Sequence, residues 1–527
     1  MKEQRFGLIF GAGLSKSFGV PSWDDLVGKL AADSEVDGER ILAAIPPRAG
    51  LPYKTEMLFE HFRKTRYTIS SPERHHTREL EYEIARDWRS KVRERLYAGV
   101  DGQLGTKLDS HPYLNALLPL IRKTHMTITY NFDDFIEQSL LHTKDPSERS
   151  SRGYETVTNP WPQFRRQEAI IYHPNGMIPQ NVLEAPSDHL VFSEASFAEQ
   201  LMGILAGNQA GLQSHLSKHT CLLIGLSLDD ETLRSALMHG ARFCPGNFHY
   251  YVSYVDESNS LSESQRQTIS RANFKVYNLI TLFLTNEEIN ALAEMIDTGL
   301  DDKEFSDFLD KQKIEKQFRF YVTGPMGVGK STVINHFRNL RVLDEWVEER
   351  HKLLIKPWPE LTNEEREDVD RWIMSQFRQK NDTLRKESSG IFMLDRGPLD
   401  PLAFAEEPER SPKAEKMLKA ICGAEMNERV ASGRVILLTG DCDDLALRLI
   451  LSKREGYTSD KLKKMEKALK QVYGKDGVVC FDTRGLAPAD VVRRVAEIVH
   501  LEDYDSDKLC DLHQRFEQIR EDVASVQ

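Results

Sequence analysis

The sequence predicts an α/β protein with two domains, each a parallel sheet with helices on both faces. At 527 residues the chain is too long to fold around a single core. Short apolar runs alternate with stretches of helical pattern, which is typical of parallel strands joined by crossover helices. This pattern starts twice, because strands expected at residues 6–10 and 318–323 are each followed by a glycine-rich turn and a helix.

The domain boundaries follow from these two starts. We place a first domain at residues 1–295 and a second at residues 317–500. Residues 296–316 are charged and lack a strand pattern, so we expect a helical or flexible linker there. Residues 501–527 have the pattern of a charged amphipathic helix, which suits a packing tail or an oligomer contact.

Composition argues against several classes of protein. The chain has 70 Lys and Arg against 82 Asp and Glu, so its net charge of −12 does not favour a nucleic-acid partner. No apolar stretch approaches the roughly 18–20 residues that span a bilayer, so no membrane partner is expected. None of the six cysteines forms a Cys-x-x-Cys pair. We therefore expect no zinc site and a reducing, cytoplasmic location.

The first glycine-rich turn follows the apolar run at residues 6–10. Gly11 and Gly13 allow the backbone to turn tightly and to approach a ligand without an intervening Cβ. A helix that begins near Ser15 would point free N–H groups at a phosphate. With Ala12 between the glycines, the turn suits the diphosphate of a dinucleotide. An ordinary strand-to-helix turn has the same appearance, because the third glycine of the usual fingerprint is missing.

Polar residues follow several other expected strands of the first domain, at residues 126–129, 169–173 and 221–225. A further strand is expected at 250–254, and residues 27–120 read as mostly helical. In open α/β sheets the carboxyl ends of the strands form the ligand crevice. The residues at these ends are Gly13 with Ser15, Asn131 with Asp133, His173 with Asn175, and Gly225 with Ser227.

The second glycine-rich turn, Gly324-x-x-x-x-Gly329-Lys330-Ser331, matches the phosphate-binding loop without a mismatch. Its backbone N–H groups would hold phosphates, Lys330 would add a positive charge, and Ser331 would hold Mg²⁺. Gly327 and Thr332 complete the predicted site. The sequence therefore predicts that the second domain binds ATP or another nucleotide with Mg²⁺.

Charged residues downstream of this loop are candidates for the same site. Asp395 ends a strand expected at residues 390–394, where a carboxylate would serve Mg²⁺ or a substrate hydroxyl. Arg396 could clamp a phosphate, although a surface salt bridge explains it as well. Arg448 and Arg454 could neutralise transferring phosphates, or they could belong to a solvated basic helix.

The second half, about residues 317–500, resembles the deoxynucleoside and thymidylate kinase group of P-loop nucleotide kinases. Besides the phosphate loop, the resemblance rests on Glu345-Trp346, on the stretch from Asp395 to Asp400, and on the lid-like segment from Arg448 to Arg454. It implies a parallel sheet with a basic lid and the use of ATP with Mg²⁺.

The first half, about residues 1–290, resembles the sirtuin-like NADase domains of bacterial phage-defence proteins, which have a Rossmann-like fold. The resemblance implies that the turn after the first strand binds NAD⁺, that Asn131 is catalytic, and that Asp133 supports the ribose or the loop. It assigns Trp23, Ser227 and Asp229 to the NAD⁺ site. The motifs that carry it are residues 11–15, 19–23, 129–133, 173–176 and 225–230.

One departure from that family leaves the base undecided. The family's His-Gly pair is Asn175-Gly176 here, and His173 lies two residues earlier, on the same face of the strand. His173 takes the base role, or the water is positioned without a base, or the domain is impaired. The four-cysteine zinc module of protein-deacylating sirtuins is missing, which favours simple NAD⁺ hydrolysis over deacylation.

These inferences give a first hypothesis of a phage-defence effector. Its first domain would hydrolyse NAD⁺ to nicotinamide and ADP-ribose. Its kinase-like domain would bind a nucleotide, and the occupancy or turnover of that nucleotide would regulate the NADase and sense infection. The alternatives are a metabolic deoxynucleoside or deoxynucleoside-monophosphate kinase with a non-hydrolytic NAD⁺ or ADP-ribose domain, and a non-catalytic sensor. Small-molecule nucleotides are the expected partners. A homo-oligomer and a phage-derived trigger are expected by analogy.

Overall fold

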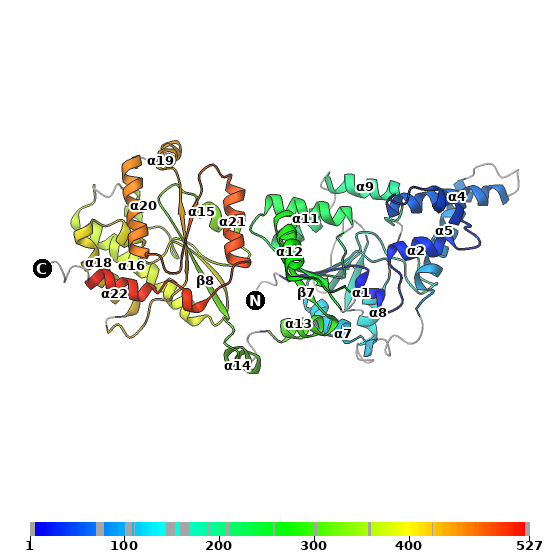
Figure 1. Cartoon of the computed structure of the whole chain (residues 1–527), viewed down its shortest axis with the longest axis horizontal. Helices are drawn as coiled ribbons and strands as arrows, with labels where there is room; N and C mark the ends of the chain where they lie inside the picture. Colours follow the sequence, from blue (N-terminus) through cyan, green and yellow to red (C-terminus); the bar gives the residue numbers. More distant parts are fainter. Residues whose placement is uncertain are drawn as a thin grey trace. The chain divides into compact units, whose positions relative to one another are not determined.

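The computed structural model of this chain divides into two compact units, Met1–Gly299 (unit 1) and Leu300–Gln527 (unit 2) (Figure 1). Each unit is built around its own parallel sheet, so the predicted fold class is confirmed. The structure describes residues 6–69, 78–100, 108–109, 111–143, 153–158, 169–187, 190–205, 210–228, 230–256, 259–299, 303–356, 360–423, 425–454 and 456–521.

Unit 1 contains a seven-stranded parallel sheet in the order β3-β4-β2-β1-β5-β6-β7. The first strand pairs with β2 on one side and with β5 on the other, so the strand order changes direction beside β1. Open sheets bind ligands at such a point. The strands are β1 (Phe6–Phe10), β2 (Met126–Thr129), β3 (Tyr154–Val157), β4 (Ala169–Tyr172), β5 (Thr220–Ile224), β6 (His249–Tyr254) and β7 (Leu279–Leu284).

The five strands that the sequence predicted in this unit are confirmed to within a residue or two, and residues 27–120 are largely helical. Apolar side chains cover both faces of the sheet, since Leu8 and Phe10 belong to one core cluster and Ile9 to the other. The helices are α1 (Gly13–Lys16), α2 (Trp23–Ala31), α3 (Glu39–Ala44), α4 (Leu51–Ile69), α5 (Arg78–Tyr97), α7 (Pro112–Lys123), α8 (Phe135–His142), α9 (Glu194–Leu205), α10 (Ala210–Lys218), α11 (Glu231–Phe243), α12 (Glu263–Tyr277) and α13 (Asn286–Thr298).

Figure 1 shows how these helices flank the sheet of unit 1. Helices α7 and α13 lie on one side of β7, and α11 and α12 lie on the other. Side chains of α2, α4, α5, α7 and α13 fill the first core cluster, whereas those of α10 and α11 fill the second. The helices cover the faces of the sheet, so a ligand site can form at the carboxyl ends of the strands.

Unit 2 contains a five-stranded parallel sheet in the order β12-β11-β8-β10-β9. Its first strand, β8, lies in the middle, between β10 and β11, so the predicted phosphate loop follows a central strand. The strands are β8 (Gln317–Thr323), β9 (Arg341–Leu343), β10 (Gly390–Asp395), β11 (Arg434–Thr439) and β12 (Val478–Asp482).

Helices cover both faces of this second sheet as well. Figure 1 shows α15 and α21 on one side of β8, and α16, α18, α20 and α22 on the other. The α-helices are α14 (Lys303–Lys311), α15 (Lys330–His336), α16 (Asn363–Lys386), α17 (Asp400–Ala403), α18 (Glu407–Cys422), α19 (Cys442–Leu451), α20 (Ser459–Tyr473), α21 (Pro488–His500) and α22 (Leu512–Glu521), and the short 3₁₀ helices are η3 (Lys352–Ile355) and η5 (Ser506–Lys508).

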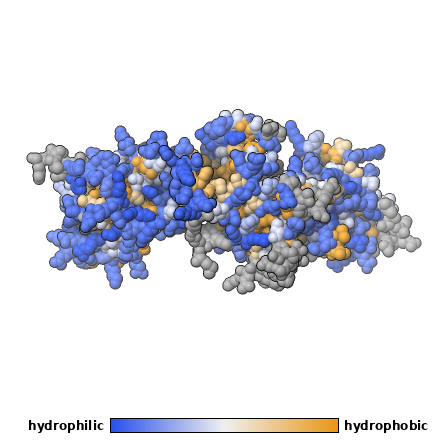
Figure 2. All heavy atoms as spheres, turned by 90° about the horizontal axis from the view of Figure 1, so that it is seen from below, coloured by the Kyte–Doolittle hydropathy of each residue, from blue (hydrophilic) through white to orange (hydrophobic). Residues whose placement is uncertain are grey.

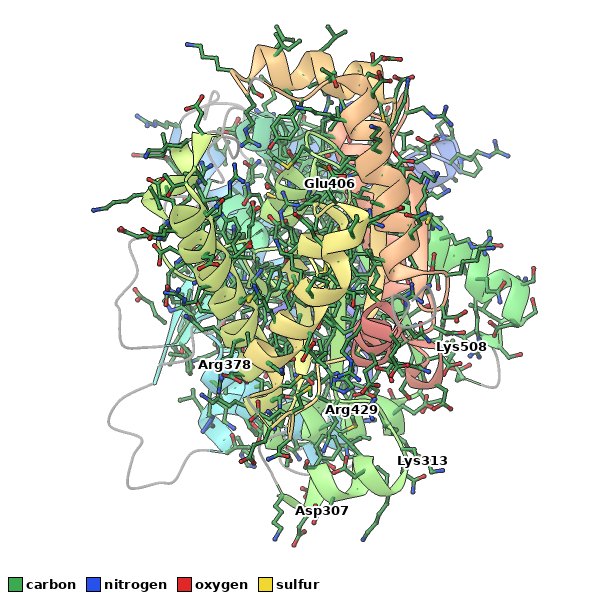
Figure 3. All side chains as sticks on the ribbon, turned by 90° about the vertical axis from the view of Figure 1, so that its left-hand side faces the viewer. Asp307, Lys313, Arg378, Glu406, Arg429 and Lys508 are labelled. Atoms are coloured by element: carbon green, nitrogen blue, oxygen red, sulfur yellow. The ribbon has the colours of Figure 1, made fainter. Side chains whose placement is uncertain are left out.

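The ends of unit 2 lie in the stretches that the sequence assigned to a linker and a tail. Helix α14 carries the exposed Asp307 and precedes the exposed Lys313, both labelled in Figure 3. Helix α22 packs against α18, and its Leu512 and Phe516 are fully buried in the core of the unit.

The visible face of the molecule in Figure 2 is mostly hydrophilic, with smaller apolar patches. Of the helices in the part of the chain that the structure describes, none is both long and apolar enough to cross a membrane.

Candidate functional site

Three glycines bring the ends of β1 and β5 into direct backbone contact. Gly11 N–H donates to the Ile224 carbonyl at 3.0 Å, and Gly13 N–H donates to the Gly225 carbonyl at 2.9 Å. A Cβ on Gly11 would lie 2.5 Å from the Gly225 oxygen, and a Cβ on Gly225 would lie 2.6 Å from the backbone nitrogen of Leu14. Gly225 also has a φ of +72°. No other residue fits these turns, so the glycines are needed for the floor of the site.

A buried chain of hydrogen bonds joins the first turn to the loop after β2. The Asn131 side-chain amide donates to Ser15 Oγ at 3.0 Å, and Ser15 Oγ donates to Asp133 Oδ1 at 3.0 Å. The Phe135 backbone N–H donates to the same carboxylate oxygen at 3.1 Å. Burial raises the pKa of Asp133 to about 6, against the hydrogen bonds that favour its charged form. Ser15 therefore connects Asn131, predicted to be catalytic, with Asp133, predicted to support the ribose or the loop.

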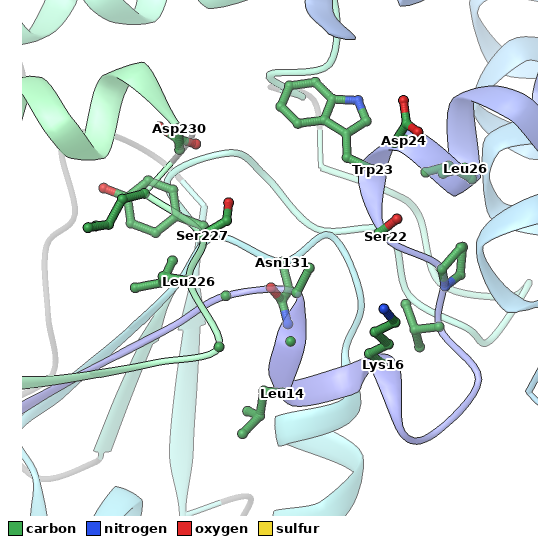
Figure 4. A pocket seen from close by; sticks show the side chains of 18 of the residues that line it. Leu14, Lys16, Ser22, Trp23, Asp24, Leu26, Asn131, Leu226, Ser227 and Asp230 are labelled. Atoms are coloured by element: carbon green, nitrogen blue, oxygen red, sulfur yellow. The ribbon is translucent and has the colours of Figure 1, made fainter. Parts of the chain in front are cut away.

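A cavity of about 1480 Å³ opens at this point, at the carboxyl ends of β1, β2 and β5. In Figure 4 Asn131 lies between Leu226, Ser227 and Asp230 on one side and Lys16 and Trp23 on the other. Asn131 Oδ1 is buried and has no hydrogen-bond partner among the described residues. A bound ligand or water would satisfy this oxygen. The predicted site residues that line the cavity are Gly11, Ala12, Gly13, Trp23, Asn131, Asp133, Asn175, Gly225 and Ser227.

His173 is placed differently. It is fully buried, and the described residues that line the cavity do not include it. Its Nδ1 lies 3.1 Å from the backbone oxygen of Asn131, and its Nε2 lies 2.9 Å from Glu137 Oε1. The neighbouring Glu137 raises the pKa of His173 against the opposing effect of burial. Asp229, another predicted site residue, lies outside the described residues.

Asn175, which replaces the family histidine, does line the cavity. Its Oδ1 accepts from Gln200 Nε2 at 3.1 Å, so its Nδ2 is directed toward Asp230 Oδ2, at 3.5 Å. Asp230 also caps α11 by accepting from the Leu233 N–H. Glu137 and Gln200 were not singled out from the sequence. Asp230 was part of the motif at residues 225–230 but was not assigned to the site, although an aspartate after a strand and before a helix is a recognisable N-cap signal.

The loop after β8 has the backbone of a phosphate cradle. Gly324, Gly327 and Gly329 have φ values of +149°, +81° and +104°. Lys330 is buried, and its Nζ donates to the Gly324 and Pro325 carbonyls, both at 2.9 Å. Burial lowers the pKa of Lys330 to about 7. Ser331 Oγ donates to Asp395 Oδ2 at 3.3 Å, which joins the loop to the end of β10.

Asp395 and Arg396 both lie beside this loop. Asp395 Oδ1 is buried and has no hydrogen-bond partner in the described part of the chain, which suits a Mg²⁺ ion held with a nucleotide. Arg396 is held by Glu345 at 2.5 Å and by Asp400 at 3.3 Å, so its guanidinium already has two carboxylates. Lys380, which sequence reasoning missed, is buried and donates to the Asp395 backbone oxygen at 2.8 Å.

The remaining residues predicted for this site are exposed, namely Thr332, Arg448 and Arg454. Helix α19 nevertheless covers the loop, since a Cβ on Gly327 would lie 3.1 Å from Leu449 Cγ. A second cavity of about 430 Å³ adjoins Ser331 and Asp395, and its lining includes Arg338, Glu345 and Trp346. Within the described ranges, no group of three or more His, Cys, Asp or Glu residues could hold a metal ion by itself.

Comparison with known families agrees with these two sites. Residues 125–277 match the family model of the SIR2-like domain. Residues 319–485 match the family model of an AAA domain. The chain thus carries a SIR2-like domain and a P-loop NTPase domain. Both predicted resemblances are confirmed at this level, and the SIR2-like match contains Asn131, His173 and Gly225. No curated protein matches the chain.

Proposed function

We propose that the SIR2-like domain hydrolyses NAD⁺ to nicotinamide and ADP-ribose. The observation that carries this proposal is the buried Asn131 Oδ1 beside the glycine turns, which has no hydrogen-bond partner in the described part of the chain. It lies in a cavity at the point where the strand order changes direction, the place at which dinucleotides bind in such sheets. The cavity, at about 1480 Å³, is larger than the roughly 300–1,000 Å³ of common ligand pockets, so a dinucleotide fits by volume.

NAD⁺ hydrolysis needs little acid catalysis from the protein. The nicotinamide ring is cationic in NAD⁺ and leaves as a neutral molecule, so the leaving group needs no proton. The C–N glycosidic bond breaks, a water oxygen bonds to the ribose C1, and the water gives up one proton. Asn131 Oδ1 would orient the water or a ribose hydroxyl by accepting its hydrogen. Asp133 lines the cavity and has a pKa of about 6, which suits a group that accepts the released proton near neutral pH.

The P-loop NTPase domain has a regulatory role in this proposal. It would bind ATP or another nucleotide with Mg²⁺ through Lys330, Ser331 and Asp395, and occupancy would control NAD⁺ hydrolysis. The resemblance to phage-defence NADases supports a role in abortive infection, with assembly into a homo-oligomer and activation by a phage-derived trigger. In the cell, such a protein would deplete NAD⁺ when invasion changes the nucleotide pool.

The experiment is mass spectrometry of NAD⁺ and its products after incubation with the purified full-length chain, with and without candidate nucleotides. We expect nicotinamide and ADP-ribose in a one-to-one ratio. Both products should be lost in Asn131→Ala and retained in the control Asn290→Ala, which changes a half-buried residue of α13 outside the cavity lining. Lys330→Ala should change the response to nucleotides and leave the NAD⁺ site intact. Absence of nicotinamide under every nucleotide condition would overturn the proposal.

A second candidate is favoured by the cavity of about 430 Å³ beside Ser331. Its acidic and aromatic lining, including Glu345 and Trp346, suits the sugar and base of a phosphate acceptor. In this alternative the chain is a metabolic deoxynucleoside or deoxynucleoside-monophosphate kinase, and unit 1 binds NAD⁺ or ADP-ribose without hydrolysis. Transfer of the ATP γ-phosphate to a deoxynucleoside, with NAD⁺ unchanged, would favour it.

A further inference from the structure

The buried pair of His173 and Glu137 lies outside the described lining of the unit 1 cavity, and His173 contacts the loop that carries Asn131. His173 follows β4, Glu137 belongs to α8, and the two side chains are 0% and 7% exposed. Thr156 on β3 donates its hydroxyl to the same Glu137 oxygen, Oε1, at 3.0 Å. Glu137 Oε2 is buried with no hydrogen-bond partner among the described residues. The carboxylate thus relies on His173 and Thr156 for its polar contacts.

Both nitrogens of the His173 ring face hydrogen-bond acceptors. Nδ1 faces the Asn131 backbone oxygen at 3.1 Å, and Nε2 faces a carboxylate oxygen at 2.9 Å. A carbonyl oxygen and a carboxylate oxygen can each bond to a ring nitrogen only through a proton. The pair of His173 and Glu137 therefore holds two protons, one at Nδ1 and one between Nε2 and the carboxylate. With both nitrogens occupied in this way, the ring has no lone pair directed at the cavity and cannot take a proton from a water bound there.

We propose that His173 and Glu137 are positioning residues that hold the backbone of Asn131, and that His173 is not the general base. This inference rests on the proposed hydrolysis of NAD⁺ by unit 1. The His173 ring holds the backbone oxygen of Asn131, and Ser15 Oγ accepts a hydrogen bond from its side-chain amide. With both contacts in place, Oδ1 is the part of Asn131 left for the substrate.

Two backbone–backbone hydrogen bonds hold this loop on either side of Asn131. Tyr130 N–H donates to the Phe10 carbonyl at 2.9 Å, and Ile178 N–H donates to the Phe132 carbonyl at 2.7 Å. The peptide of Asn131 itself depends on His173 at its oxygen and on Thr129 Oγ1 at its nitrogen. Loss of the His173 contact would therefore release Asn131 at the position where the reaction needs it fixed.

Steady-state kinetics on His173→Gln, Glu137→Gln and the double variant test the pair. Since a displacement of 1 Å can cost about 100-fold in rate, we expect each single change to lower kcat by about 10- to 100-fold with KM nearly constant. The double variant should be no worse than either single variant, because both act on one contact. The acidic limb of the kcat/KM profile should persist in His173→Gln. His239→Gln, which changes an exposed residue of α11, is the matched control.

The opposite pattern would overturn the inference. A general base at His173 predicts that the acidic limb of the kcat/KM profile is lost in His173→Gln. Because removal of one partner of a buried ion pair is costly, Thr156→Val provides a milder variant that keeps the pair. It should lower kcat in the same direction by a smaller factor, whereas Thr156→Ser should restore the wild-type rate.

Hydrogen–deuterium exchange of residues 126–137, measured without NAD⁺, separates this inference from the proposed function. Exchange should quicken in both single variants and stay unchanged in His239→Gln. If the wild-type chain released no nicotinamide, the proposed function would fail, while the exchange data would still test the pair. Unchanged exchange in both variants would overturn the positioning role whatever the NAD⁺ result.

Discussion

The side-chain amide of Asn131 donates a hydrogen bond to Ser15 Oγ, 3.0 Å away, and so joins the loop after β2 to the turn after β1. Ser15 has one hydroxyl proton, which it gives to Asp133. It must therefore accept from Asn131, and the amide nitrogen of Asn131 is the atom that points at it. This orientation leaves Oδ1 for a ligand. Ser15 therefore determines that the amide oxygen of Asn131, and not its nitrogen, is available to a ligand.

Ser15→Ala tests that relationship. The change leaves the Asn131 amide and the Asp133 carboxylate without their shared partner, at a cost of about 1–3 kcal/mol for a buried polar group. We expect nicotinamide release to fall by about 10- to 100-fold, because each 1.4 kcal/mol corresponds to a factor of ten. The control is Ser264→Ala, which changes an exposed serine of α12. Equal rates for the two variants would mean that Ser15 does not orient Asn131.

Gly225→Ala should disrupt the proposed NAD⁺ site by a steric clash. Gly225 has a φ of +72°, and an added Cβ would lie 2.6 Å from the Leu14 nitrogen, so the two turns would have to separate. We expect loss of NAD⁺ binding by calorimetry and a lower melting temperature. The matched control is Gly240→Ala in α11, where a Cβ would meet nothing within 4 Å. That change should stabilise the helix by about 0.5–1 kcal/mol and keep NAD⁺ binding.

The parts of the molecule that depend on local pattern were predictable from the sequence. Gly11, Gly13 and Asn131 follow short apolar runs, and the carboxyl ends of parallel strands meet at one edge, so their proximity followed from the strand pattern. The loop from Gly324 to Ser331 is defined by its own spacing. The structure agrees with both predictions, because the backbone approaches Gly11 and Gly13 closely and because Gly324, Gly327 and Gly329 have positive φ values.

Contacts between distant residues were not predictable in the same way. The sequence left His173 and Asn175 as rival candidates, because both fit one strand face. Only the packed structure shows that Glu137, in α8, binds the His173 ring, whereas Asn175 lines the cavity. Likewise, the Tyr473 hydroxyl donates to Asp400 from 73 residues away. No sequence period encodes such side-chain pairings.

Nucleotide binding to unit 2 should take up a proton above neutral pH. Burial lowers the pKa of Lys330 to about 7 in the free protein, whereas the phosphates of a bound nucleotide would raise it. Between pH 7 and pH 9 the affinity should therefore fall by up to about tenfold per pH unit. Calorimetry at pH 8 in two buffers of different ionisation enthalpy measures the proton directly. Identical heats in both buffers would contradict this linkage.

Unit 1 should lose stability in mild acid. The His249 ring accepts from the Cys221 backbone N–H at 3.1 Å through Nδ1, so it must be unprotonated there, and burial lowers its pKa from 6.5 to about 4. Burial likewise lowers the pKa of His215, which stacks on His219.

Because the unfolded state binds these protons more readily, stability is lost as pH falls from 6.5 toward 4, by about 1.4 kcal/mol per pH unit for each histidine. Melting temperatures between pH 7.5 and pH 5 measure the loss. His249→Gln keeps an acceptor for the Cys221 N–H and should reduce the slope, whereas the exposed His239→Gln should not. A flat profile in the wild-type chain would contradict the prediction.

The charge of the cavity predicts that the SIR2-like domain prefers NAD⁺ to NADP⁺. Of the charged residues described in its lining, carboxylates outnumber cations. Lys16 is the cation, and the carboxylates are Asp24, Asp133, Glu194, Asp230, Glu231 and Asp256. The additional phosphate of NADP⁺ would bring about −1.5 to −2 charges into this acidic surface. Repulsion between these like charges weakens the binding of NADP⁺, and salt reduces this repulsion by screening it.

We therefore expect kcat/KM to be at least about tenfold higher for NAD⁺, which corresponds to about 1.4 kcal/mol, and the ratio to shrink as ionic strength rises. Lys16→Ala should weaken binding of both dinucleotides, because it removes the cation from the described lining of the cavity. Lys29→Ala, an exposed lysine of α2, is the control. A preference that did not change with salt would assign the selectivity to shape, and equal use of both dinucleotides would contradict an electrostatic filter in this cavity.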